Sequence, residues 1–225
     1  MQLSPVQVRV LGSLIEKERT TPDNYPLTMN GLLAACNQTT SRYPVVNLNE
    51  PTVESALLNL RGDGLLRVVH SRSNRADRYR HLLDEALELS QAEVAVLGVL
   101  MLRGPQTAAE LRTRTERLHP FTDQDEVEVV LDGLARRVEP LVARLGRAPG
   151  QKEARWAHLL GGEVADAAPP APVAGEPRGS RTERLEAVEA ALAALSADVE
   201  RLRAEHEALA AQLGASVTPP PAPPG

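Results

Sequence analysis

The sequence predicts a mainly α-helical α+β protein: two tandem winged-helix domains, a flexible linker and a C-terminal coiled-coil helix. The first observation is a repeat, since LSPVQVRVLGSL at residues 3–14 returns as LSQAEVAVLGVL at residues 89–100. The second is that each copy is followed by two more helix-like segments and two strand-like segments. A period of roughly eighty residues is the size of a small domain, so the chain contains a tandem duplication.

Composition sets the expected domain bounds and compartment. We expect domain 1 at 1–83, domain 2 at 84–160, a Pro/Ala/Gly linker at 161–179, the helix at 180–214 and a disordered Pro-rich tail at 215–225. Apolar residues make up 42% of the chain and aromatic residues 2%, so the cores should consist of Leu, Val and Ala. We expect no membrane span and no signal peptide. The single cysteine, Cys36, fits a cytoplasmic protein and a small buried side chain.

Capping boxes predict where the helices begin. Ser4 with Gln7 should start the first helix, with Pro5 at its first position. Ser90 with Glu93 repeats this device. Second helices are expected at 28–36 and 107–118, where Thr107 pairs with Glu110, and third helices at about 50–61 and 123–137.

Strand-like segments follow each third helix. They lie at 65–70 and 76–82 in the first copy, and at 141–145 and 154–158 in the second. Three helices followed by a two-stranded hairpin is the winged-helix layout, and analogy at the level of the fold points to double-stranded DNA as a partner.

Charge is distributed unevenly along the chain. Residues 1–83 carry ten Lys/Arg against seven Asp/Glu, residues 84–160 carry ten against thirteen, and residues 161–225 carry five against ten. A polyanion would therefore meet domain 1 and be repelled by the rest.

The predicted wing of domain 1 is the main argument for DNA binding. It is rich in arginine and has a polar tip, which suits phosphate contacts. The expected DNA contacts are Arg42, Thr52, Arg72, Asn74 and Arg75. A merely solvated arginine-rich hairpin explains the wing equally well, and the polar segment 37–43 could equally be a loop that holds itself together.

Other residues argue against DNA. Thirteen residues separate Cys36 from Glu50, whereas a helix-turn-helix uses a turn of three or four, so we expect the third helix to be displaced. Acidic residues begin that helix and line its counterpart in domain 2. Domain 2 is therefore expected to pack against domain 1, a second subunit or a protein partner.

A heptad pattern over 180–214 predicts self-association. Apolar residues recur at alternating steps of three and four, with His206 at one core position. The expected seam is Leu185, Val188, Leu192, Leu195, Val199, Leu202, Leu209 and Leu213. The alternative is a lone amphipathic helix that docks on the domains.

No pattern of a catalytic, metal or cofactor site is present in the sequence. The five histidines are scattered, and there is no phosphate-binding glycine loop and no nucleophile elbow. His81 and His158 occupy equivalent positions, each followed by Leu-Leu, and we interpret both as structural. We expect a non-enzymatic protein without cofactors.

Several segments resemble the YceH-like family of bacterial proteins. They are TPDNYPLTMNG at 21–31, ACNQ at 35–38, LRGPQT at 102–107 with ELR at 110–112, and Pro149-Gly150 leading to Arg155. The resemblance covers residues 3–160 and extends to a C-terminal helix, whereas the linker and tail look peculiar to this chain. It implies tandem winged-helix domains, and it implies no activity, because none is established for that family.

Two functions therefore remain open. The first is a DNA-binding regulator that uses domain 1 and its wing. The second is an interaction scaffold in which the winged-helix surfaces and the coiled coil bind proteins without DNA.

Overall fold

The computed structural model describes residues 2–70, 77–146, 153–162 and 199 of the 225-residue chain. The chain divides into two units, residues 1–169 and 170–225. In the second unit only Val199 is described, and it is helical and exposed. The expected linker beyond residue 162 and the expected tail lie outside the described residues, as does the seam apart from Val199.

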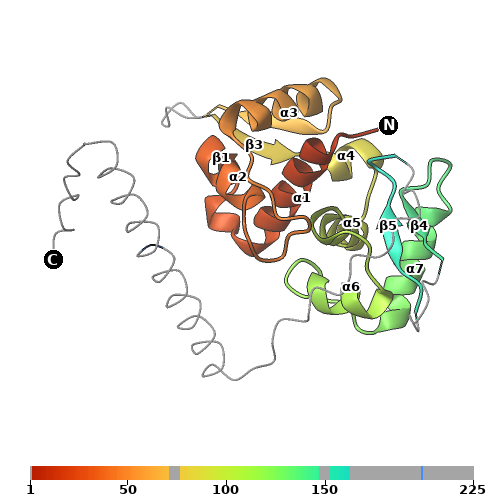
Figure 1. Cartoon of the computed structure of the whole chain (residues 1–225). Helices are drawn as coiled ribbons and strands as arrows, with labels where there is room; N and C mark the ends of the chain where they lie inside the picture. Colours follow the sequence, from red (N-terminus) through yellow and green to blue (C-terminus); the bar gives the residue numbers. More distant parts are fainter. Residues whose placement is uncertain (1, 71–76, 147–152, 163–198, 200–225) are drawn as a thin grey trace, which may run out of the picture. The chain divides into compact units, whose positions relative to one another are not determined.

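The first repeat contains three α-helices and a three-stranded sheet (Figure 1). Its elements are α1 (Pro5–Thr20), the 3₁₀ turn η1 (Pro22–Asn24), β1 (Leu27–Thr28), α2 (Met29–Cys36), α3 (Glu50–Gly62), β2 (Leu66–Val69) and β3 (Arg78–His81). The three expected helices and both expected strands are confirmed. The sequence reading missed β1, because two residues are too few to show a period of two.

The second repeat has the same order of helices and a two-stranded sheet. Its elements are α4 (Leu83–Leu87), α5 (Gln91–Arg103), α6 (Ala108–Thr115), α7 (Gln124–Ala135), β4 (Val142–Arg144) and β5 (Trp156–His158). Helix α6 ends three residues earlier than expected. The short helix α4 connects the repeats and was missed, because it has no capping side chain that could have marked it.

The capping boxes predicted at Ser4, Ser90 and Thr107 are present. Ser4 and Gln7 exchange hydrogen bonds at the start of α1, and Ser90 and Glu93 do so at α5. Thr107 and Glu110 exchange the same pair of hydrogen bonds at the start of α6. Each box satisfies two backbone groups that a helix end otherwise leaves unpaired, so the helix boundaries follow directly from local sequence.

The sheets close each repeat. Strand β3 lies between β1 and β2, with Leu27 opposite Tyr79 and Leu66 opposite His81, and all pairs are antiparallel. In the second repeat β4 pairs with β5, and Gln106 forms an isolated bridge to Trp156. Gln106 immediately precedes Thr107, the N-cap of α6, as β1 immediately precedes α2. The bridge is therefore the second repeat's reduced counterpart of β1.

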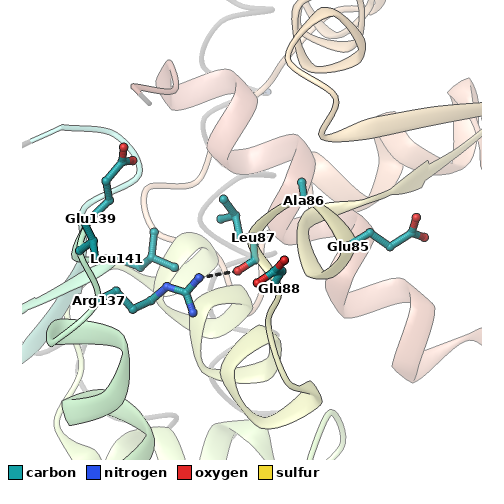
Figure 2. A pocket seen from close by; sticks show the side chains of 8 residues that line it. Glu85, Ala86, Leu87, Glu88, Arg137, Glu139 and Leu141 are labelled. Carbon is teal, nitrogen blue, oxygen red and sulfur yellow. Dashed lines mark hydrogen bonds between the residues drawn. The ribbon is translucent and has the colours of Figure 1, made fainter.

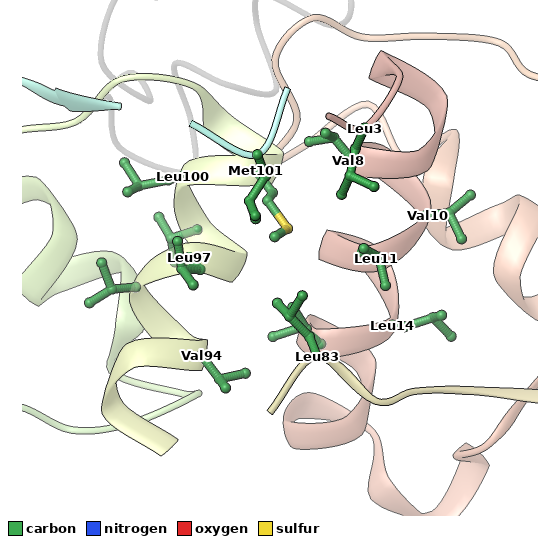
Figure 3. Close-up of a cluster of buried hydrophobic side chains, with 14 of the residues drawn as sticks. Leu3, Val8, Val10, Leu11, Leu14, Leu83, Val94, Leu97, Leu100 and Met101 are labelled. Atoms are coloured by element: carbon green, nitrogen blue, oxygen red, sulfur yellow. The ribbon is translucent and has the colours of Figure 1, made fainter. Parts of the chain in front are cut away.

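The two repeats share one core, which is centred on α1 and α5 (Figure 3). These helices lie side by side, with α3 on one side and α6 and α7 on the other (Figure 1). Nine consecutive residues of each helix are buried, Gln7–Ile15 and Val94–Leu102. A helix that is buried all round belongs in the middle of a core, so the second repeat packs against the first, which is one of the arrangements that we expected.

Glycines bring the two central helices together. A Cβ on Gly12 would lie 3.0 Å from Met101 Cβ, and one on Gly98 would lie 2.7 Å from Ile15 Cγ2. Gly12 corresponds to Gly98 in the repeat, and Ile15 corresponds to Met101. The two contacts are therefore the same contact made twice, as in an interface between identical subunits.

The coarse fold class is thus confirmed as helix-rich α+β with small antiparallel sheets. Across the part of the chain that the structure describes, no helix is both long and apolar enough to cross a membrane.

Candidate functional site

The loop between α2 and α3 is closed at its base by one side chain. Asn37 donates from Nδ2 to the Leu48 carbonyl and accepts the Leu48 N–H at Oδ1, both at 2.8 Å. Asn37 directly follows α2, and Leu48 directly precedes Asn49, the N-cap of α3. The end of α2 and the start of α3 are therefore adjacent, and the displacement that we expected from the loop's length is corrected.

The rest of this loop lies against the end of α5. The N–H of Tyr43 donates to the Leu102 carbonyl over 2.7 Å, and Arg103 donates to Ser41 Oγ. Arg9 on α1 also donates to the carbonyls of Cys36 and Pro44. The loop thus ties the first repeat to the second, which is a structural role that accounts for much of its polar composition.

Arg42 differs most from our expectation of a DNA contact. Its side chain is 0% exposed and binds both carboxylate oxygens of Glu16, at 2.7 and 3.1 Å. It also donates twice to the Ala35 carbonyl. A phosphate could reach Arg42 only if these bonds broke, because arginine has no remaining exposed donor here. Its role is to hold the loop, and we remove it from the candidate interface.

Glu16 is the electrostatic partner of this arginine. Burial would raise the pKa of Glu16, but the hydrogen bond and charge of Arg42, with a smaller contribution from Lys17, outweigh burial and hold the pKa below its usual range. The carboxylate is therefore ionised at neutral pH and forms a bidentate pair with Arg42.

The α3 face is the surface that a winged helix would turn toward DNA. We define it by the exposed residues of α3: Glu50, Pro51, Thr52, Glu54, Ser55, Leu58, Asn59, Arg61 and Gly62. Thr52, an expected contact, is exposed, but its hydroxyl donates to Asn49 Oδ1 within the cap. Leu58 is 63% exposed. Thr52 is therefore accessible to a partner molecule. Its neighbours on the α3 face include two carboxylates and one large apolar side chain, Leu58.

Three carboxylates act on Tyr79 of β3, and two of them belong to the α3 face. Burial raises the pKa of Tyr79 on β3, and the charges of Asp77, Glu54 and Glu50 raise it further. Each of these carboxylates opposes an added negative charge at the tyrosine. They would oppose a phosphate group in the same way.

The wing is described only at its base. Arg72, Asn74 and Arg75 lie outside the described residues. Arg67 is exposed at the start of the hairpin, whereas Arg78 donates to the Pro26 carbonyl. Arg80 pairs with Glu85 on α4. Arg67 also lies within 4.0 Å of a Glu85 carboxylate oxygen, so all three described arginines of the wing have partners in the molecule, and the tip remains a prediction.

The α7 face is the equivalent surface of the second repeat. Its exposed residues are Asp125, Glu126, Glu128, Val129 and Gly133, with the half-buried Asp132 beside them. Val129 is 71% exposed, and α7 contains no lysine or arginine. The predicted acidic character is therefore displayed on the surface, with an exposed aliphatic side chain among the carboxylates.

The paired histidines have different surroundings. His81 is buried, and its Nε2 lies 3.1 Å from Glu18 Oε2 while its Nδ1 accepts the Leu83 N–H. At His158, burial lowers the pKa to about 4, and Nδ1 is buried without a hydrogen-bond partner. The position in the second repeat that matches Glu18 is Gly104. The acid partner is thus present in one repeat only.

Cys36 is buried, as expected, and burial raises the pKa of its thiol. Among the described residues, no three His, Cys, Asp or Glu side chains lie close enough together to hold a metal ion.

A groove beside α4 was not predicted. It consists of two hollows of about 480 and 350 Å³ that share Leu87, Val138, Glu139 and Leu141 (Figure 2). The first is also lined by Glu85, Ala86, Glu88 and Arg137, and the second by Pro140, Leu159 and Leu160. Arg137 donates to the Leu87 carbonyl and joins the end of α7 to α4 (Figure 2). We call this surface the α4 groove. No feature of the sequence predicted this groove, because the sequence analysis did not predict the helix α4 that forms one of its walls.

Comparisons with known proteins agree with the resemblance seen in the sequence. Residues 3–151 match the family described as "Protein of unknown function, DUF480". A UPF0502 protein from Geobacter sulfurreducens is 55% identical over 165 residues, which cover 72% of this chain and 73% of that protein. Another, from Burkholderia ambifaria, is 45% identical over 220 residues, 97% of this chain and 92% of that protein.

The Burkholderia alignment also corrects one expectation. An alignment of 220 residues takes in the linker and part of the tail, so that relative has a segment corresponding to the linker. A UPF0502 protein from Pelobacter propionicus is 54% identical over 164 residues, 73% of this chain and 74% of that protein. On the extent of the family match and the identity to these relatives, the chain belongs to the DUF480 family, whose relatives here carry the name UPF0502.

Proposed function

We propose that this chain is a non-enzymatic tandem winged-helix protein whose α3 and α7 faces bind a protein partner. The order of elements supports the winged-helix assignment, because each repeat has three helices followed by a hairpin, with an extra strand or bridge joined to it. The second helix is preceded by the strand β1 in the first repeat and by the Gln106 bridge in the second, which agrees with that layout.

The negative charge of the third helices α3 and α7 is the observation that favours a protein over DNA as the partner. Between them, α3 and α7 contain six carboxylates and one arginine, Arg61. Phosphates approaching either face would be repelled, while a protein surface can offer basic and apolar groups. Leu58 and Val129 are the exposed aliphatic side chains that such a partner would cover.

Site-specific photo-crosslinking tests this proposal. A photoreactive amino acid placed at Leu58 or Val129 should give discrete protein adducts in the organism that encodes the chain. The matched control is Ala109, which is exposed on α6 and belongs to neither face, and it should give none. Equal adducts at all three positions, or none at Leu58 and Val129, would contradict the proposal.

DNA binding through the first repeat is the second candidate, and the Asn37 bridge favours it. That bridge brings α2 and α3 into the close succession that a helix-turn-helix needs, despite the long loop. In this case Arg72→Ala and Arg75→Ala should weaken duplex binding and reduce its salt dependence. Unchanged binding in both variants would exclude the wing as the contact.

Self-association through residues 180–214 is retained as a separate proposal, and it rests on the heptad pattern alone. Light scattering should report an oligomer for the full chain and a smaller species after deletion of 180–214. A monomeric full chain at tens of micromolar would contradict it, as would an unchanged size after the deletion.

A further inference from the structure

The buried His81 lies between two carboxylates that come from different elements. Its Nε2 is 3.1 Å from Glu18 Oε2 on α1, and its Nδ1 is 3.6 Å from Asp84 Oδ1 on α4. The imidazole is 1% exposed, so these contacts are largely shielded from water. Within the part of the chain that the structure describes, Asp84 Oδ1 is buried and accepts no hydrogen bond. One of the two carboxylates therefore has an acceptor atom to spare beside the ring.

The hydrogen bonds of His81 determine which nitrogen carries the proton of the neutral ring. Nδ1 accepts the Leu83 N–H over 3.3 Å, so the proton is on Nε2 and is donated to Glu18. This hydrogen bond is the largest cause that holds the pKa of Glu18 below its usual range, and Glu18 is therefore ionised at neutral pH. A second proton, on Nδ1, would point at the Leu83 N–H, donor against donor, while the spare oxygen of Asp84 lies beside it.

Each element around the ring contributes charged or titratable groups. Burial raises the pKa of Tyr25, whose hydroxyl accepts the His81 backbone N–H over 3.0 Å, so this phenol is neutral. The cation Arg80 is paired with Glu85. Of these groups, the two carboxylates contact the ring nitrogens, and both attract a positive charge there. The full set is Glu18 and Arg19 on α1, Tyr25 at the end of η1, Arg80 on β3, and Asp84 with Glu85 on α4.

The second repeat has the same histidine without either carboxylate. Gly104 takes the position of Glu18, and Gly161 takes that of Asp84. Gly161 lies against the ring, since a Cβ added there would be 3.8 Å from His158 Cε1. Burial lowers the pKa of His158 to about 4, which keeps that ring neutral at physiological pH. The two carboxylates are therefore what distinguishes the histidine of the first repeat from that of the second.

We propose that His81 is a pH-sensitive switch that couples its protonation to the position of α4, the helix that joins the two repeats (Figure 1). When Nδ1 takes a proton from solvent, it releases the Leu83 N–H and donates to Asp84 Oδ1 instead. The Asp84 carbonyl accepts the N–H groups of Glu88 and Leu89, which end α4. A movement of Asp84 toward the ring is therefore passed along the whole helix. The switch is independent of the partner proposed above.

Nuclear magnetic resonance of the full chain, from about pH 8 to pH 5, tests the switch. The ring nitrogens of His81 should change from the neutral form with Nε2–H to the imidazolium while the chain stays folded. The amide signals of Leu83 and Asp84 should move with the same midpoint. His158 is the internal comparison and should stay mostly neutral, because burial holds its pKa at about 4. A His81 ring that stays neutral throughout would overturn the proposal, as would a protonation that leaves both amide signals unmoved.

Matched variants separate a switch from a histidine that only titrates. Asp84→Asn keeps the shape of the side chain and removes its charge, so the Leu83 amide signal should move at a lower pH and by less. Glu88→Gln removes one charge from the exposed end of α4 and should change neither the midpoint nor the size of this movement. His81→Gln keeps a hydrogen-bond acceptor in the ring's place and should abolish the movement. Equal effects of Asp84→Asn and Glu88→Gln would contradict the switch, and so would a Leu83 signal that still moves in His81→Gln.

Discussion

Gly98 lies directly against Ile15, so close that a Cβ at position 98 would be 2.7 Å from Ile15 Cγ2. The reciprocal contact joins Gly12 to Met101, the residue equivalent to Ile15. The two repeats are therefore joined through backbone approach at the crossing of α1 and α5. This makes the two repeats one packed body, in which the α3 and α7 faces, on separate repeats, have a fixed relation.

Adding a methyl group at this crossing should destabilise the protein. We expect Gly98→Ala to lower the free energy of unfolding by about 1–3 kcal/mol, since overpacking forces side chains or helices to shift. Gly133→Ala on α7 is the control, because no atom lies within 4 Å of its added Cβ. It should raise stability by about 0.5–1 kcal/mol through helix propensity. Urea unfolding measures both, and a neutral Gly98→Ala would mean that the helices are not in close contact.

Arg42 should matter for stability and not for nucleic-acid affinity. Arg42→Ala leaves the half-buried Glu16 carboxylate with only Lys17 as a partner and removes the hydrogen bonds to the Ala35 carbonyl, so it should cost up to about 3–5 kcal/mol. The double variant Arg42→Met with Glu16→Leu should cost less than Arg42→Ala, because no unpaired charge remains. Arg61→Ala on the exposed end of α3 is the control and should stay within about 0.5 kcal/mol of the parent. Equal effects of Arg42→Ala and Arg61→Ala on thermal unfolding would contradict the buried ion pair.

Asn37 should control the order of the loop that it closes. Asn37→Ala removes both hydrogen bonds to Leu48, and each is worth about 0.5–1.5 kcal/mol. Residues 38–47 should then exchange their amide hydrogens faster, while α5 stays protected. Asn30→Ala, at an exposed position of α2, is the comparison. Unchanged exchange in the loop of Asn37→Ala would show that the loop's contacts with α5 suffice to hold it.

His158 should make stability depend on pH. Its folded pKa of about 4 lies below the usual 6.5, so the unfolded chain takes up a proton first as the pH falls. The contribution of neutral His158 to the free energy of unfolding is therefore fully present above pH 6.5. It falls as the pH drops toward 4, by at most about 1.4 kcal/mol per pH unit. Unfolding measured from pH 7.5 to 5 should show this slope in the parent and less of it in His158→Asn. Identical slopes would contradict the assignment.

Much of the fold was accessible from the sequence because its signals are local. The boxes at Ser4, Ser90 and Thr107 mark helix starts by satisfying backbone groups within one turn, and the repeat doubles every such signal. The two-residue strand β1 and the uncapped helix α4 carry no local signal, since long-range pairing and packing hold them. They were found only in the structure.

The candidate site could be predicted less well from the sequence, because it depends on which side chains the fold buries. Nothing in the sequence distinguishes Arg42 from the wing arginines, yet Arg42 is buried and donates its hydrogen bonds to the Glu16 carboxylate and the Ala35 carbonyl. The bridge from Asn37 to Leu48 spans eleven residues and cancels the effect of the loop's length. Neither arrangement has a spacing rule that would reveal it in one sequence.

Fluorescence anisotropy of a labelled random-sequence duplex, from about 50 to 200 mM salt, tests the central claim most directly, because phosphate contacts show their salt dependence in this range. The acidic α3 and α7 faces predict no binding even at the lowest salt. Binding that falls steeply with salt, and that weakens in Arg72→Ala and Arg75→Ala, would contradict the account and place the first repeat on DNA.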